Sequence, residues 1–212
     1  MLNAMVRVKI CGITNLEDAL LAADLGANAL GFIFYPPSPR KVDPEAAREI
    51  IRQLPPFIVT VGVFVNEEAS VVQKLAARVG LDWVQLHGQE SPEYCHSLGR
   101  RVLKGFRIKD EDSLKALQDY RGSVQAFLLD TYKKGQTGGT GEAFDWDLAR
   151  QAQDYGAIVL AGGLTPANVV LAIKTAQPQA VDVASGVEAA PGKKDPEKLR
   201  AFFAGVKGVS NQ

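Results

Sequence analysis

Eight short apolar segments, rich in Val, Ile, Leu and Phe, recur along the chain and alternate with segments of helical character. The apolar segments cover 6–10, 29–35, 57–65, 82–87, 101–108, 126–130, 157–163 and 180–186. The expected helices cover 15–26, 43–54, 67–80, 91–99, 110–120, 145–156, 165–176 and 195–205. Nearly continuous apolar strands that alternate with helices predict a parallel sheet with both faces covered.

Several of the expected helices begin with a recognisable capping signal. Asp43, Ser91, Thr165 and Asp195 are each followed by proline, which is tolerated in the first helical turn. Gly26 supplies a stop signal after the first helix. These signals predict where the helices start and reinforce the alternating pattern.

Two architectures accommodate eight such units. A (β/α)8 TIM barrel closes the sheet, whereas an open doubly wound sheet would usually carry a G-x-G-x-x-G fingerprint after its first strand. The stretch "CGITN" at 11–15 does not match that fingerprint. We therefore predict an α/β protein with a single (β/α)8 barrel domain over 1–212, in which 1–5 is an N-terminal extension and 207–212 a C-terminal tail. Met5 is an alternative start to Met1.

Composition narrows the class of protein. Lysine plus arginine total 24, as do aspartate plus glutamate, so no net charge attracts nucleic acid or an acidic membrane surface. No apolar run approaches the ~20 residues of a membrane span, and we expect a cytoplasmic protein. The two cysteines, Cys11 and Cys95, are expected to be free thiols, and no metal site is predicted.

The carboxyl ends of the strands, where such barrels build their sites, carry residues with chemical potential. Cys11 ends the first strand, where it is either a reactive thiol or a small buried hydrophobe. Asp130 ends a fully apolar strand and serves either a substrate or a structural salt bridge. His87 ends the fourth strand and is either a ligand group or a structural histidine. Cys95 and His96 lie on a helix. We expect Cys95 to pack in the core and His96 to face solvent.

Glycine-rich turns follow the last two strands. Gly162 and Gly163 follow the seventh, and Ser185 and Gly186 follow the eighth. In barrels these turns present backbone N–H groups to a phosphate, although tight turns alone also require glycine. A further glycine cluster at 133–146 is long enough to form a lid.

Eight blocks of this sequence together resemble the phosphoribosylanthranilate isomerase family of tryptophan biosynthesis. They are "KICGIT", "FYPPSPRKV", "VGVFVN", "VQLHGQES", "LLDT", "GGTGEAFDW", "LAGGLTPANV" and "DVASGVE". The family is a (β/α)8 barrel that catalyses, without a cofactor, the Amadori rearrangement of N-(5-phosphoribosyl)anthranilate to 1-(2-carboxyphenylamino)-1-deoxyribulose 5-phosphate. The resemblance covers nearly the whole chain.

The resemblance implies roles for individual residues. Cys11 corresponds to the general base, Asp130 to the general acid, and Arg40 to the residue that meets the anthranilate carboxylate. The remaining residues expected to bind substrate are His87, Gly141, Gly162, Gly163, Asp182, Ser185 and Gly186. Asp130 must arrive protonated and Cys11 deprotonated, so we expect a dry pocket to raise the pKa of the former and cationic or amide neighbours to lower that of the latter. The expected partner is a phosphorylated small molecule, and the expected assembly a monomer or homodimer.

Three competing functions differ in the residues that they need. Indole-3-glycerol phosphate synthase needs a lysine acid, and the third strand ends in "FVNEE" without one. A pentulose-phosphate epimerase needs several metal-binding histidines, whereas this chain has two histidines. A noncatalytic phosphate-binding barrel would keep the glycine turns but leaves Cys11 and Asp130 without a purpose.

Overall fold

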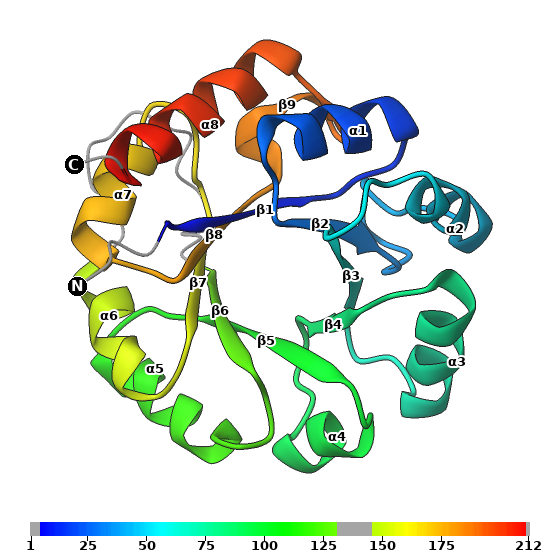
Figure 1. The fold of residues 1–212 in the computed structure, drawn as a ribbon. Coiled ribbons are helices and arrows are strands. Elements are labelled where there is room, and N and C mark those ends of the chain that lie inside the picture. Colours follow the sequence, from blue (N-terminus) through cyan, green and yellow to red (C-terminus); the bar gives the residue numbers. More distant parts are fainter. Residues whose placement is uncertain (1–4, 131–145, 211–212) are drawn as a thin grey trace.

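Eight parallel strands close into a barrel surrounded by helices (Figure 1). The structure, a computed structural model, describes residues 5–130 and 146–210. The strands are β1 (Arg7–Cys11), β2 (Ala29–Ile33), β3 (Val59–Phe64), β4 (Trp83–Leu86), β5 (Arg101–Arg107), β6 (Ala126–Asp130), β7 (Ile158–Ala161) and β8 (Ala180–Val183). Because β1 pairs with β8 as well as with β2, no open edge remains and the predicted (β/α)8 barrel is confirmed.

The helices follow the strands in the predicted order. They are α1 (Leu16–Leu25), α2 (Pro44–Arg52), α3 (Ala69–Val79), α4 (Pro92–Ser97), α5 (Glu111–Lys115), α6 (Trp146–Gln151), α7 (Val169–Ala176) and α8 (Pro196–Ser210). The 3₁₀ helices η1 (Ala116–Tyr120) and η2 (Ala152–Asp154) extend α5 and α6. Asp43, Ser91 and Asp195 accept hydrogen bonds from backbone N–H groups of α2, α4 and α8, as their capping signals predict.

Successive residues of each strand face opposite sides of the barrel wall. In β1, Val8 and Ile10 join the large hydrophobic core. Lys9 and Cys11, which alternate with them, lie among buried residues on the inner side, and Cys11 lines the central cavity. Because the side-chain period of a strand is two, a chain that buries its aliphatic residues against the helices must send the residues between them inward.

The barrel interior has an apolar part and a polar part. A small cluster of Leu103, Ala126, Leu128 and Ala161 packs inside β5, β6 and β7. Other inward positions carry buried polar side chains, among which Lys9, Gln85 and Asp182 are the ones that the site uses. The barrel therefore holds charge where a barrel without a site would be filled by aliphatic side chains.

Three local features differ from the sequence-based expectation. A short antiparallel hairpin of β9 (Glu188–Ala190) and β10 (Lys193–Lys194) follows β8, where no strand was predicted. Thr165 does not cap α7, because that helix starts later, at Val169. Residues 207–210 are helical and continue α8 rather than forming a tail, since the buried Val206 and the partly buried Val209 pack on the core.

The turns after β7 and β8 pack directly on each other at Gly186. A Cβ atom at this position would lie 1.8 Å from the carbonyl oxygen of Leu164, so only glycine fits without movement of the backbone. Gly162 and Gly163 adopt φ values of 81° and 66°, in the left-handed region that favours glycine. The glycines that the sequence marked as phosphate-binding are thus also required by the shape of these turns.

We predict that Gly186→Ala lowers the free energy of unfolding by about 1–3 kcal/mol, because the added methyl group must displace the Leu164 carbonyl. Gly208→Ala is the control, since open space surrounds Gly208 in α8. It should raise the stability by about 0.5–1 kcal/mol through helix propensity. Urea titration followed by circular dichroism measures both, and equal stabilities of the two variants would contradict the close packing of the turns.

Candidate active site

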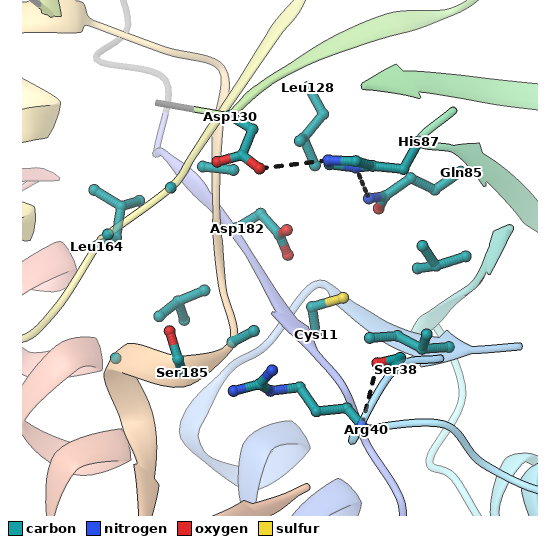
Figure 2. A pocket seen from close by; sticks show the side chains of 18 of the residues that line it. Cys11, Ser38, Arg40, Gln85, His87, Leu128, Asp130, Leu164, Asp182 and Ser185 are labelled. Atoms are coloured by element: carbon teal, nitrogen blue, oxygen red, sulfur yellow. Dashed lines mark hydrogen bonds and ion pairs between the residues drawn. The ribbon is translucent and has the colours of Figure 1, made fainter. Parts of the chain in front are cut away.

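A cavity of about 540 Å³ opens at the carboxyl ends of the strands (Figure 2). Nine of the ten residues predicted from the sequence line it: Cys11, Arg40, His87, Asp130, Gly162, Gly163, Asp182, Ser185 and Gly186. The tenth, Gly141, and most of the expected lid lie outside the described residues. Figure 2 shows Leu164 and Ser185 on one side of the cavity, Gln85 and His87 on the other, and Cys11 between them.

Cys11 lies beside a buried ion pair. The closure of the barrel aligns Lys9 of β1 with Asp182 of β8, and Lys9 Nζ donates a hydrogen bond of 2.8 Å to Asp182 Oδ1. Cys11 follows Lys9 by two residues, so its side chain points the same way and is 5% exposed. The thiol thus faces the cavity next to one positive and one negative charge.

Burial and neighbouring charges shift the pKa values of Cys11 and Lys9. Burial raises the pKa of the Cys11 thiol, an effect that the Lys9 ammonium opposes and the Asp182 carboxylate reinforces. Burial by itself lowers the pKa of Lys9, but the nearby Asp182 and Cys11 outweigh it and raise that pKa. The expectation that cationic neighbours lower the pKa of Cys11 below its usual value is therefore wrong, because desolvation exceeds the attraction of Lys9.

Asp130 faces the cavity from the end of β6 and lies against His87. Oδ2 of Asp130 is 3.4 Å from Nε2 of His87, and each side chain is 22% exposed. On the other side of the imidazole ring, Nε2 of Gln85 lies 3.3 Å from Nδ1. Figure 2 shows these three side chains in a row that ends at Asp130.

Arg40 reaches the cavity from the loop after β2 and is held by Glu188 of β9. Its Nε donates to both carboxylate oxygens of Glu188, at 2.9 and 3.0 Å, and Nη2 donates to Oε2 at 2.7 Å. Lys194 of β10, which is fully buried, donates to Oε1 of the same carboxylate at 3.0 Å. Burial alone raises the pKa of Glu188, but Arg40 and Lys194 outweigh it and hold the pKa below its ordinary range.

Lys194 also joins the hairpin to the barrel. Its Nζ donates to the backbone oxygen of Cys11 at 2.6 Å and to that of Ala184 at 3.3 Å, and its backbone N–H donates to Asp18 of α1. One ammonium group therefore fastens the carboxyl ends of β1 and β8 together. The position of the Cys11 backbone depends on this contact.

Sequence reasoning missed four residues of the site. Gln85 and Arg107 also line the cavity, and Glu188 and Lys194 support Arg40. The alternation of β4 carried a usable signal for Gln85, because it lies two residues before His87 and so shares its face. Glu188 and Lys194 carried none, since they meet Arg40 and Cys11 only through the hairpin.

Within residues 5–130 and 146–210, no group of three or more His, Cys, Asp and Glu side chains is arranged to hold a metal ion. In the same part of the chain, no helix is both long and apolar enough to cross a membrane.

Fold and site together define a (β/α)8-barrel enzyme that presents a thiol and a carboxyl group to one cavity. The family model of N-(5'-phosphoribosyl)anthranilate (PRA) isomerase matches residues 8–205. The chain is 56% identical over 206 residues to the N-(5'-phosphoribosyl)anthranilate isomerase of Citrifermentans bemidjiense, a match that covers 97% of this chain and 99% of the relative. The chain belongs to the phosphoribosylanthranilate isomerase family.

Solved structures agree with this assignment. One is a phosphoribosylanthranilate isomerase in complex with reduced 1-(o-carboxyphenylamino)-1-deoxyribulose 5-phosphate, at 46% identity and a TM-score of 0.87, covering 96% of this chain and 100% of the other. Another contains monomers generated from the dimeric phosphoribosylanthranilate isomerase of Thermotoga maritima, at 45% identity, a TM-score of 0.86 and the same coverage.

We predict that Cys11 ionises above the ordinary thiol pKa of 9.0, because burial outweighs the attraction of Lys9. The rate of alkylation by iodoacetamide, followed by mass spectrometry in a Cys95→Ala background, should therefore rise with pH to a midpoint above that value. Burial raises the pKa of Cys95 to about 11, so this thiol would also react at high pH. Replacing Cys95 leaves Cys11 as the thiol whose alkylation is measured.

Lys9→Gln should move the midpoint for Cys11 further up, because it removes the nearest positive charge. A midpoint that stays in place or moves down in Lys9→Gln would contradict this account of the site.

Proposed function

We propose that Cys11 and Asp130 are the general base and the general acid of the reaction that this enzyme catalyses. That reaction is the Amadori rearrangement of N-(5-phosphoribosyl)anthranilate to 1-(2-carboxyphenylamino)-1-deoxyribulose 5-phosphate, a step of tryptophan biosynthesis. The observation that carries the assignment is that both side chains line one cavity, from strands on different sides of the barrel.

The rearrangement needs one proton donor and one proton acceptor. Asp130 gives a proton to the furanose ring oxygen, the C1–O bond breaks, and the ring opens to a Schiff base between C1 and the anthranilate nitrogen. The Cys11 thiolate then removes the proton from C2, and the electron pair moves to the C1–nitrogen system to form an enolamine. Protonation of this enolamine at C1 and loss of the proton of its C2 hydroxyl group give the ketone, so this step takes up one proton and releases one. The chemistry is redox-neutral overall and needs no external oxidant.

The raised pKa of Cys11 has a kinetic consequence. Near pH 7 only a small fraction of the thiol is ionised, and that fraction is the reactive base. A thiolate held in a buried site by Lys9 is a stronger base than one with a depressed pKa, which favours abstraction of a proton from carbon. Lys9 keeps the ionised form accessible, and Asp182 holds Lys9 in place.

The two ends of the cavity suit the two anionic ends of the substrate. We place the phosphate at the turns that contain Gly163 and Gly186, where backbone amides and Ser185 are at hand. We place the anthranilate carboxylate at Arg40. Because Glu188 takes up the N–H of Nε and one N–H of Nη2 of Arg40, the second N–H of Nη2 and both N–H groups of Nη1 can meet the substrate. His87, Gly162 and Asp182 remain predicted substrate-binding residues on their position in the cavity wall.

We predict that Asp130→Asn retains the affinity of the site for a product analogue but lowers kcat by ~10² or more, the loss typical of a missing general acid. Cys11→Ala should also lose ~10²–10⁴ of kcat with little change in KM. Turnover is followed by the loss of phosphoribosylanthranilate fluorescence, and binding by calorimetry.

Cys95→Ala is the matched control for Cys11→Ala, since Cys95 is buried in the core away from the cavity. It should leave kcat nearly unchanged. If Asp130 were only a salt-bridge anchor, Asp130→Asn would melt at a lower temperature and keep its activity in proportion to the folded fraction, which would overturn the assignment.

We also propose that the chain forms a homodimer through the connection between α2 and β3. Phe57 in this connection is 98% exposed and has a φ value of 72°, so it is both unburied and strained. It lies at the end of the barrel opposite the site, where contact with a second copy leaves the cavity open. The dimeric relative from Thermotoga maritima supports this assembly.

The cytoplasmic location stays a prediction.

We predict that Phe57→Gly weakens self-association, because it removes the apolar side chain while glycine adopts this φ value freely. Analytical ultracentrifugation across protein concentrations measures the effect, and Leu171→Ser on α7, which also changes an exposed apolar residue, is the control. A wild-type protein that stays monomeric at high concentration would rule out the proposed dimer.

A further inference from the structure

Gln85 is a buried polar residue in the cavity wall that the reaction mechanism does not use. It belongs to β4, is 2% exposed, and lies two residues before His87. Its Nε2 is 3.3 Å from Nδ1 of His87. Its Oε1 has no hydrogen-bond partner among the residues that the structure describes. A buried amide in a strand is costly unless its polar atoms serve a purpose, so this residue requires an explanation.

The imidazole ring of His87 is held from its face as well as from both nitrogens. A Cβ atom at Gly105 of β5 would lie 2.7 Å from Nδ1 of His87, so the ring rests against backbone that only glycine leaves open. Gln85 meets Nδ1 at one edge, and Asp130 Oδ2 lies 3.4 Å from Nε2 at the other. The ring therefore has little freedom to turn, and the remaining variable is which nitrogen carries the proton.

We propose that Gln85 is a positioning residue that holds His87 in the neutral Nε2–H form and thereby keeps the acid proton on Asp130. An amide nitrogen only donates hydrogen bonds, so Nδ1 of His87 must accept, and the ring proton must be on Nε2. Nε2–H then faces Oδ2 of Asp130, which lies 3.4 Å away. This role rests on the proposed function of Asp130 as the general acid.

The arrangement has a direct chemical consequence. Because Nε2 of His87 already carries a proton, it cannot take another from Asp130, and the acid proton stays on the carboxyl group. If Nδ1 carried the ring proton instead, Nε2 would present a lone pair to Asp130. The proton would then move to His87, giving an imidazolium beside a carboxylate, and Asp130 would no longer be the acid.

The unpartnered oxygen of Gln85 gives the substrate a means of reinforcing this state. A hydroxyl group of the bound sugar that donates to Oε1 would fix the amide with Nε2 toward His87.

The other ionisable groups that line the cavity are Cys11, Tyr35, Arg40, Arg107 and Asp182. Variants at Gln85 leave all of them in place.

The proposal can be tested by reading the tautomer of His87 directly, because the chain has two histidines and the other, His96, is exposed on α4. In a His96→Gln background, ¹⁵N–¹H correlation spectra report only the ring nitrogens of His87. We expect a protonated Nε2 and an unprotonated Nδ1 at neutral pH. In Gln85→Glu, whose carboxylate only accepts, the proton should appear on Nδ1.

Activity provides the second measurement. Gln85→Glu should lower kcat by ~10² or more, as for a lost general acid, with KM changed by less than about threefold. Gln85→Met, which neither donates nor accepts strongly, should lose less, because it leaves both tautomers open. Gln89→Glu adds the same charge on an exposed residue of the following loop and should change neither the spectrum nor kcat.

An Nδ1–H form of His87 in the otherwise unaltered protein would overturn the proposal, and so would full activity in Gln85→Glu. If Gln85→Glu does not fold, the spectrum of the His96→Gln protein still decides. Failure of the proposed acid role is a separate result, since an active Asp130→Asn enzyme would remove that role whichever tautomer His87 adopts.

Discussion

The buried ion pair between Lys9 and Asp182 links the closure of the barrel to the environment of Cys11. It forms where the last strand meets the first, so it exists only in the closed barrel. Removing one partner of such a buried pair leaves an uncompensated charge, which typically costs several kcal/mol. The same pair sets the field at Cys11. Barrel closure and the protonation of the thiol are therefore linked through two side chains.

The hairpin after β8 connects the barrel wall to Arg40, which lies in the loop after β2. Lys194 bonds the backbone of Cys11 and the carboxylate of Glu188, and Glu188 in turn holds the guanidinium of Arg40. Two of these three groups are positive and one is negative, so the chain of contacts keeps a net positive charge at that side of the cavity. The guanidinium of Arg40 is thereby held in position by its own chain.

Opposite Arg40, the site is built from hydrogen-bond direction rather than from net charge. Gln85, His87 and Asp130 form a row in which His87 lies 3.3 Å from Gln85 and 3.4 Å from Asp130. Gly105 leaves room for the imidazole ring, as Gly186 leaves room for the turn after β7. Gln85 lies in β4, His87 directly follows β4 and Asp130 ends β6, which keeps the geometry of the row more precise than loops alone would allow.

The sequence by itself determined the barrel, which follows from local patterns, and it predicted nine residues that line the cavity, partly from strand ends and partly from a family resemblance. Alternating apolar strands and capped helices specify parallel pairing, and residues such as Cys11 and Asp130 stand visibly at strand ends. Only the tertiary structure decided the pKa of Cys11, since that value depends on burial and on Asp182, far away in sequence. The support of Arg40 by Glu188 was likewise settled by the fold, because a charge pair carries no local pattern when its partners meet only after the barrel has closed.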